Sequence, residues 1–407
     1  MPSRIRIKLL KVADFLLGGL LCWLLTRLLS LRQNDYFTPV HLEGFRRVLL
    51  IRPGGVGDMV VLLPVIALLK QRFPDAAMDI ICEKRNQPVL KLMGLEKAAL
   101  PYDTHPLRLL SKLLRTRYDV AVDTEQFHHF SAVFAALSGA AVRVGFKINP
   151  FRNALYTHLV NYSPDGPELV QFLRLLEPLG IRDDHAALTG ILAQYQEILP
   201  PSCPQDFLRM LTSEAFVVLH PGASSVYKQW PPDKFSELAI QLHRRHSLAV
   251  VIVGDQNDRP AGDLILTQCR KAGCPTLSWQ GTLSLLETTA VLARGRLFVG
   301  TDSALGHLAV ALGRPTVVLF GPSDSAKWGV VDALHAVVRA NLPCSPCSIF
   351  GYQKTCRSIA CMKYITVEAV MAECERILRS SSPNALLSEV QANRLSRSID
   401  NKERGKA

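Results

Sequence analysis

The sequence predicts an α/β fold of two doubly wound, Rossmann-like halves that face a cleft. Short, continuous apolar runs recur along the chain, and such runs are typical of parallel strands that are buried on both faces. Loops rich in Gly, Ser or Asp follow these runs directly and open helical patterns. With 407 residues, the chain is also longer than one hydrophobic core usually serves, so two domains are expected.

The first half opens with an apolar run at 48–51, followed by a helical pattern over 59–72. Further strands of this half are predicted at 78–82, 118–123 and 142–146. The second half repeats the alternation, with strands predicted at 216–219, 248–253, 297–300 and 316–321 and helices over 235–243 and up to Ala311. We therefore expect one domain over 46–200 and another over 201–379, with an N-terminal segment at 1–45 and a polar tail at 380–407.

The charge balance favours an anionic partner. The chain has 47 basic and 35 acidic residues, a formal net charge of +12. A phosphorylated substrate and an anionic membrane surface both fit this charge, and a solvated basic surface is the plainer alternative. Nucleic acid is not expected as a partner, because the sequence has no helix-turn-helix, no aromatic-rich RNA-binding strand and no long Lys/Arg block in its middle.

The N-terminal segment combines a basic start at 3–8 with an uncharged, mostly apolar stretch at 15–26. A spanning helix needs about 20 apolar residues, so this stretch is short for one. Its basic flank and Trp23 favour a helix that lies in the membrane interface. A true membrane span and a helix packed on its own domain are the alternatives. Because no cleavable secretory signal is evident, we expect a reducing, cytosolic location.

Ligands of parallel sheets bind beyond the carboxyl ends of the strands, so the loops at these ends are the candidate sites. The loop after the first strand reads Pro-Gly-Gly-Val-Gly-Asp over 53–58. Gly55 and Gly57 let the backbone approach a ligand closely, and Asp58 is placed where a carboxylate would face the cleft. Taken alone, this loop favours Asp58 as a helix N-cap, a role that contributes about 1 kcal/mol.

The loop after the strand at 297–300 carries hydroxyl groups immediately before a helix. Thr301 and Ser303 supply the hydroxyls, and the helix start supplies backbone N–H groups, which together suit a diphosphate. His307 lies four residues after Ser303, so it either faces the same ligand or packs against the protein. A capped helix with no ligand is the alternative for this loop.

Two further loops of the second half carry charged candidates. Lys228 is a compact cation that suits a phosphate, although a lone Lys before a Trp is more often a surface residue. Asp255 and Asp258 follow the strand at 248–253, where an acid often holds ribose hydroxyls. Both acids are equally compatible with ordinary turns.

Four cysteines lie close together near the C-terminus, with the spacing Cys344-x2-Cys347-x8-Cys356-x4-Cys361. Four thiols so close in a cytosolic chain suit a tetrahedral structural zinc or iron site. The spacing is not that of a standard zinc ribbon, so free thiols and disulfides remain alternatives.

These loops, in this order, resemble glycosyltransferase family 9, the ADP-heptose:lipopolysaccharide heptosyltransferases. The matching stretches are 49–74, 217–230 and 297–322, with 118–123 and 142–146 also fitting, and the likeness covers roughly 47–366. The resemblance implies a GT-B fold with an acceptor-side and a donor-side domain, inversion at the sugar carbon and no cofactor for catalysis. It also implies ADP-heptose as donor, a phosphorylated glycolipid of the lipopolysaccharide core as acceptor, and a peripheral position on the cytoplasmic face of the inner membrane.

The resemblance assigns roles to the candidate residues. Asp58 matches the proposed catalytic base, Lys228 the lysine on the phosphate side, and Asp258, less securely, an acid near the donor ribose. The donor-binding loop corresponds to Thr301, Asp302, Ser303, Gly306 and His307. The segment 123–126 departs from the family's Asp-x-Gln-Gly pattern, in a region that borders the acceptor side.

Two other functions are compatible with the same sequence. One is a GT-B transferase that uses another nucleotide sugar or a protein acceptor. The other is a membrane-associated binding protein that kept the fold and lost catalysis. The presence of both Asp58 and Lys228 favours an active transferase over the binding protein.

Overall fold

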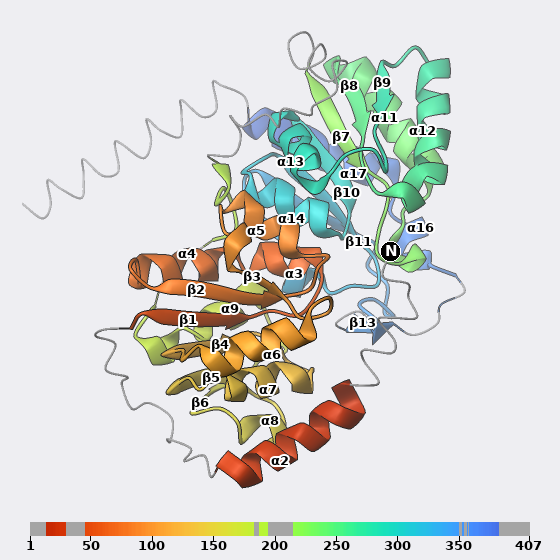
Figure 1. Cartoon of the computed structure of the whole chain (residues 1–407). Helices are drawn as coiled ribbons and strands as arrows, with labels where there is room; N and C mark the ends of the chain where they lie inside the picture. Colours follow the sequence, from red (N-terminus) through yellow and green to blue (C-terminus); the bar gives the residue numbers. More distant parts are fainter. Residues whose placement is uncertain are drawn as a thin grey trace, which may run out of the picture. The chain divides into compact units, whose positions relative to one another are not determined.

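The computed structural model describes residues 14–29, 45–182, 187–193, 215–349, 352–353, 356 and 358–381. The chain forms two compact units that divide between Ile191 and Leu192. Each unit contains a six-stranded parallel sheet with helices against it (Figure 1). The predicted α/β class with two doubly wound halves is thus confirmed, whereas the predicted boundary at 200 and the tail after 381 lie outside the described residues.

The sheet of the first unit has the strand order β3-β2-β1-β4-β5-β6. The bounds are β1 Arg47–Ile51, β2 Ala77–Cys82, β3 Ala99–Pro101, β4 Val120–Asp123, β5 Val142–Lys147 and β6 His158–Asn161. Strand order reverses between β1 and β4, and Ile51 pairs with Asp123 at the end of both strands. The loops after β1 and β4 therefore start side by side, at the point where open sheets bind their ligands.

The buried strands of this unit were predictable, and its two edge strands were not. Residues 48–51 of β1 are completely buried, which explains their continuous apolar run. The edge strand β3 has only three residues, which are half-buried, and β6 contains His158 and Asn161, so neither has a long apolar run.

The helices of the first unit cover both faces of its sheet (Figure 1). Their bounds are α3 Val56–Val61, α4 Leu63–Arg72, α5 Gln87–Leu92, α6 Pro106–Arg115, α7 His129–Leu137, α8 Pro150–Asn153 and α9 Glu168–Arg174. The single helix predicted over 59–72 is two helices that meet at Leu62, and the first begins three residues earlier than predicted. Gly55 is consequently the N-cap residue, and Asp58 lies at the third helical position, so the N-cap interpretation of Asp58 is corrected.

The N-terminal segment forms the π-helix η1 (Asp14–Gly18) and the helix α2 (Gly19–Leu29). Cys22 is completely buried in the core of the first unit, and the Asp14 carboxylate accepts hydrogen bonds from the backbone N–H groups of His129 (3.0 Å) and Phe130 (2.8 Å) at the start of α7. One face of α2 thus packs on its own domain, as the alternative interpretation expected, while most of its leucines are exposed. Among the described helices, none is long and apolar enough to cross a membrane.

The sheet of the second unit has the order β12-β11-β10-β7-β8-β9. Its bounds are β7 Phe216–His220, β8 Ala249–Ile252, β9 Thr276–Ser278, β10 Leu297–Thr301, β11 Thr316–Phe320 and β12 His335–Arg339. The helices are α11 Pro232–His246, α12 Arg259–Lys271, α13 Leu285–Arg294, α14 Ala304–Ala311, α15 Ser325–Trp328, α16 Ala360–Lys363 and α17 Val367–Ser380. Trp230 anchors this core, since its indole is buried and its Nε1 donates to the Ile365 carbonyl at 3.1 Å.

Candidate functional site

Asp58 lies at the carboxyl end of the first sheet, where two hydrogen bonds fix its carboxylate. Its Oδ1 accepts from Arg52 Nη2 at 2.7 Å, and its Oδ2 accepts from the Gly55 backbone N–H at 2.7 Å. A Cβ atom on Gly55 would lie only 2.9 Å from Oδ2, so glycine lets the carboxylate fold back on the loop. Gly57 lies in the first turn of α3. About a quarter of the Asp58 side chain stays exposed (28%), so a substrate can reach it.

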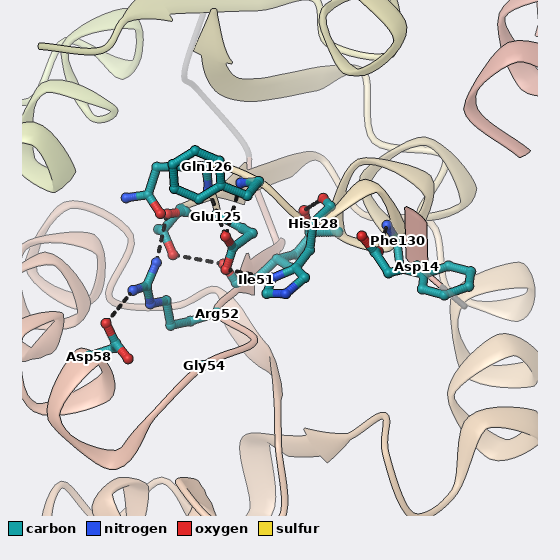
Figure 2. Close-up of polar contacts among 12 residues, drawn as sticks. Asp14, Ile51, Arg52, Gly54, Asp58, Glu125, Gln126, His128 and Phe130 are labelled. Carbon is teal, nitrogen blue, oxygen red and sulfur yellow. Dashed lines mark hydrogen bonds and ion pairs between the residues drawn. The ribbon is translucent and has the colours of Figure 1, made fainter. Parts of the chain in front are cut away.

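Arg52 is the residue on which this arrangement depends, although it is not among the candidates that the sequence predicts. Figure 2 shows its guanidinium between Asp58 and the loop that follows β4. Nη1 donates to the Thr124 carbonyl at 2.9 Å, and the guanidinium lies 4.8 Å from the centroid of the Phe172 ring. Burial alone would lower the pKa of Arg52, but the charges of nearby Asp58, Glu125 and Glu168 raise it, so the buried side chain stays a cation.

The loop that carries Arg52 and Gly54 is also held by Asn86, the N-cap residue of α5. Asn86 is completely buried, and its Nδ2 donates to the carbonyls of Arg52 (3.4 Å) and Gly54 (3.2 Å). Its Oδ1 accepts from the Glu83 backbone N–H at 3.0 Å. The backbone before Asp58 is therefore held by side chains as well as by its own helix.

Glu125, in the loop after β4, is a buried carboxylate that this site keeps ionised. Its Oε1 accepts from the backbone N–H groups of Gln126 and Phe127, each at 3.0 Å, and its Oε2 lies 3.3 Å from His128 Nδ1. Burial raises the pKa of Glu125, but the hydrogen bond and charge of His128, the charge of Arg52 and the Phe127 N–H together lower it to about 2.

The completely buried side chain of Arg152 holds the loop after β4 in place. Its guanidinium donates to the carbonyls of Gln126 and Glu125 (2.6 Å to the latter) and lies 3.3 Å from the Asp123 carboxylate. Gln126 in turn donates to Glu168. The segment that departs from the family pattern is therefore held by several buried hydrogen bonds.

In the second unit, the structure brings Lys228 together with the loop after β10. Lys228 Nζ lies 2.7 Å from Asp302 Oδ2, and the Thr301 hydroxyl donates to the Gly222 carbonyl. Burial raises the pKa of Asp302, but the charges of Lys228 and His307 more than offset this, so that the pKa lies below its ordinary value. A buried ion pair thus presents the ammonium group at the carboxyl ends of β7 and β10.

Asp258 joins the loops that follow β7 and β8. Its Oδ2 accepts from the Asp255 backbone N–H at 2.8 Å and lies 3.5 Å from His220 Nε2. A Cβ atom on Gly222 would lie 2.1 Å from its carboxylate, so this contact requires glycine. Asp258 is buried while Asp255 is exposed, and contact of either acid with a ribose stays a prediction.

The helix α14 begins at the predicted diphosphate site. Ser303 is its N-cap residue, but the Ser303 hydroxyl is 3.0 Å from His220 Nδ1 and makes no capping bond to its own helix. Gly306 and His307 line a small hollow together with Trp328, whose ring centroid is 6.3 Å from that of His307. Lys228 and Asp302 therefore lie in one cluster with Ser303, Gly306 and His307, as predicted. Contact of these residues with a ligand stays a prediction.

The four cysteines near the C-terminus lie near one another without forming a complete metal site among the described residues. Within the described parts of the chain, no group of three or more His, Cys, Asp or Glu side chains is arranged to hold a metal ion, and no disulfide joins the described cysteines. Burial and the neighbouring thiols of Cys347, Cys344 and Cys356 raise the pKa of Cys361, so these three thiols lie near that of Cys361. Cys356 Sγ accepts from the backbone N–H of Ile359 at 3.4 Å.

Several known proteins similar to this chain are bacterial heptosyltransferases. Residues 107–357 match glycosyltransferase family 9 (heptosyltransferase), a match that does not include Asp58. Lipopolysaccharide heptosyltransferase 3 of Escherichia coli K12 is 29% identical over 67% of this chain and 81% of its own length. Lipopolysaccharide heptosyltransferase 2 of Salmonella typhimurium is 29% identical over 82% and 98%. The E. coli heptosyltransferase WaaC, solved with ADP-2-deoxy-2-fluoro heptose, is 18% identical, with a TM-score of 0.61 over 81% of this chain and 99% of its own.

The lowered pKa of Glu125 predicts a pH-dependent contribution to stability. A carboxylate whose pKa is about 2 when folded and 4.5 when unfolded stabilises the fold fully above pH 4.5 and loses that contribution as the pH falls toward 2. Glu125→Gln should therefore lower the free energy of unfolding at pH 7, and the deficit should shrink below pH 4.5. Urea unfolding of both proteins across this range measures it; a deficit that does not change with pH would contradict the ionised state of Glu125.

Proposed function

This chain belongs to glycosyltransferase family 9, and on that basis we propose that it transfers heptose from ADP-heptose to a lipopolysaccharide core acceptor with inversion at the sugar carbon. The names of its relatives, which are lipopolysaccharide heptosyltransferases, support the sugar and the acceptor class. The WaaC complex with an ADP-heptose analogue supports the donor. The main structural support for this chemistry is that each unit holds one charged group in place. In the first unit Arg52 fixes the accessible carboxylate of Asp58, and in the second unit Asp302 fixes the ammonium group of Lys228.

Asp58 is the proposed base. As the acceptor hydroxyl attacks the anomeric carbon, the Asp58 carboxylate takes its proton. Each carboxylate oxygen accepts one hydrogen bond, from Arg52 or from Gly55, and so keeps lone-pair capacity for the acceptor. Arg52 is a positioning residue in this proposal, because it orients the carboxylate without contacting the reacting atoms.

Lys228 and the start of α14 are the proposed stabilisers of the leaving group. The departing ADP gains negative charge, which an ammonium ion and helix N–H groups stabilise without reorganisation. Asp302 holds Lys228 Nζ at 2.7 Å and fixes where that charge lies. The proposal needs no metal for catalysis.

We also propose a peripheral position on the cytoplasmic face of the inner membrane. The acceptor is a phosphorylated glycolipid, so the enzyme has to work at an anionic membrane surface. The exposed apolar face of α2, together with the net charge of +12, supports such a location.

Exchange of the Asp58 carboxylate tests the chemistry. Asp58→Asn keeps the size of the side chain but removes the base, so kcat should fall by about 10²- to 10⁴-fold while ADP binding is retained. Turnover of ADP-heptose with truncated lipopolysaccharide and calorimetry with ADP measure the two effects. The matched control is Asp165→Asn, which removes an exposed carboxylate from the same unit and should leave kcat unchanged. Undiminished turnover by Asp58→Asn would eliminate the base assignment.

For Cys344, Cys347, Cys356 and Cys361 we propose a structural zinc or iron ion with no part in catalysis. The nearness of Cys344, Cys347 and Cys356 to Cys361 and the backbone hydrogen bond to Cys356 Sγ support this, since thiolate ligands commonly accept such bonds. Protein purified without a His tag should contain about one metal ion per chain, and Cys347→Ser should lose it. Elemental analysis that finds no metal in the unaltered protein would refute the proposal.

A further inference from the structure

Exposed large apolar side chains are concentrated on two helices of the first unit, α2 and α6. Those of α2 and η1 are Leu16, Leu17, Leu20, Leu21, Trp23, Leu24 and Leu28, and those of α6 are Leu107, Leu110 and Leu114. Leu107 is 81% exposed and Leu114 is 64% exposed, which is unusual for leucines within a helix. A concentration of exposed apolar side chains of this kind indicates a site of interaction.

The side chains of α6 form three stripes. Leu109 and Leu113 are spaced by four residues and are buried against the sheet. Leu107, Leu110 and Leu114 have the spacing i, i+3, i+7, so they form a second stripe, which is exposed. A third stripe, at i, i+4, i+7, is basic and consists of Arg108, Lys112 and Arg115. The helix is therefore apolar on two sides and basic on the third.

The charged residues within the α6 segment are all basic. No acidic residue lies between Thr104 and Tyr118, a segment that contains Arg108, Lys112, Arg115 and Arg117. The three arginines are exposed, whereas Lys112 lies 3.2 Å from Asp79. Exposed arginines beside an exposed leucine stripe complement an anionic lipid surface, where the apolar chains enter the acyl boundary and the guanidinium groups remain among the phosphates.

The helices α2 and α6 belong to the same face of the first unit. Both contact α7, and in Figure 1 α7 lies between them. Cys22 of α2 and Leu109 and Leu113 of α6 share one hydrophobic cluster, and the Asp14 carboxylate attaches the start of the N-terminal helix to α7. The two exposed apolar stripes are thus carried by one rigid layer of helices.

We propose that α6, together with α2, forms a two-helix surface that binds the anionic lipid bilayer. The N-terminal helix is then one of two contact elements, and the second is built into the body of the acceptor-side unit. Two contacts on one rigid layer fix the orientation of that unit on the membrane, whereas a single helix would act only as a tether. The inference rests on the proposed function only in supposing an acceptor that is anchored in lipid.

Vesicle binding by the full-length protein tests the surface without any need for turnover. The probes are vesicles of phosphatidylcholine with and without phosphatidylglycerol, and binding is measured by co-sedimentation. One variant, Leu107→Ser/Leu110→Ser/Leu114→Ser, removes the exposed leucine stripe, and another, Arg108→Gln/Arg115→Gln/Arg117→Gln, removes the charges. The matched control on α12 of the second unit, Leu264→Ser/Arg270→Gln/Lys271→Gln, changes an exposed leucine and two exposed basic residues.

Each α6 variant should bind anionic vesicles roughly tenfold or more weakly than the unaltered protein, and the control should bind equally well. A parallel variant of α2, Leu17→Ser/Leu20→Ser/Leu24→Ser, should lose binding while Cys22 stays in the core. Thermal unfolding confirms that the variants are folded. Unchanged vesicle binding by both α6 variants would overturn the proposal.

A second result distinguishes a protein partner from the membrane. If light scattering shows a dimer that the leucine variant of α6 converts to a monomer while vesicle binding persists, the stripe is an interface between copies of the chain and the proposal fails. If the protein turns over no nucleotide sugar yet the α6 variants lose vesicle binding, the proposed reaction fails and the surface stands.

Discussion

A buried guanidinium, that of Arg52, is the constraint on which the first unit's site depends. It follows directly after β1, at the point where strand order reverses, and it joins Asp58 to the Thr124 carbonyl of the neighbouring loop. A buried cation has to be compensated, and here Asp58, Glu125 and Glu168 compensate it. The carboxylate proposed as base is thus part of the compensation of a buried charge, so its position is defined before any substrate binds.

The second unit also pairs a buried charged group with a more exposed one, but the signs of the two charges are reversed. There a buried carboxylate, Asp302, holds a more accessible cation, Lys228, whereas in the first unit a buried cation holds an accessible carboxylate. Each unit therefore presents one charged group at the carboxyl ends of its strands and uses a buried partner to fix it. A proton acceptor and a stabiliser of negative charge are the two groups that an inverting transfer requires.

Much of this architecture could be predicted from the sequence, because buried parallel strands leave continuous apolar runs and their loops begin where the runs stop. The grouping of Lys228 with the loop at 301–307 followed only from the family resemblance, because a lone Lys before a Trp is more often a surface residue. The role of Arg52 was not predictable, because its partners are distant in sequence. The β1–β4 pairing brings Thr124 and Glu125 near it, and Glu168 comes from the start of α9. Asp58 was misread as an N-cap because its helix starts at Val56, and periodicity alone could not place that start.

The kinetic effect of replacing Arg52 tests the account most directly. Arg52→Met keeps the apolar stem beside Phe172 but removes the hydrogen bonds to Asp58 and Thr124, so kcat should fall by roughly 100-fold with little change in the KM for the sugar donor. Arg52→Lys, which restores a cation, should recover part of that loss, a recovery that a purely structural defect would not give. Wild-type kcat in the folded Arg52→Met protein would contradict the claim that this buried guanidinium positions the catalytic carboxylate.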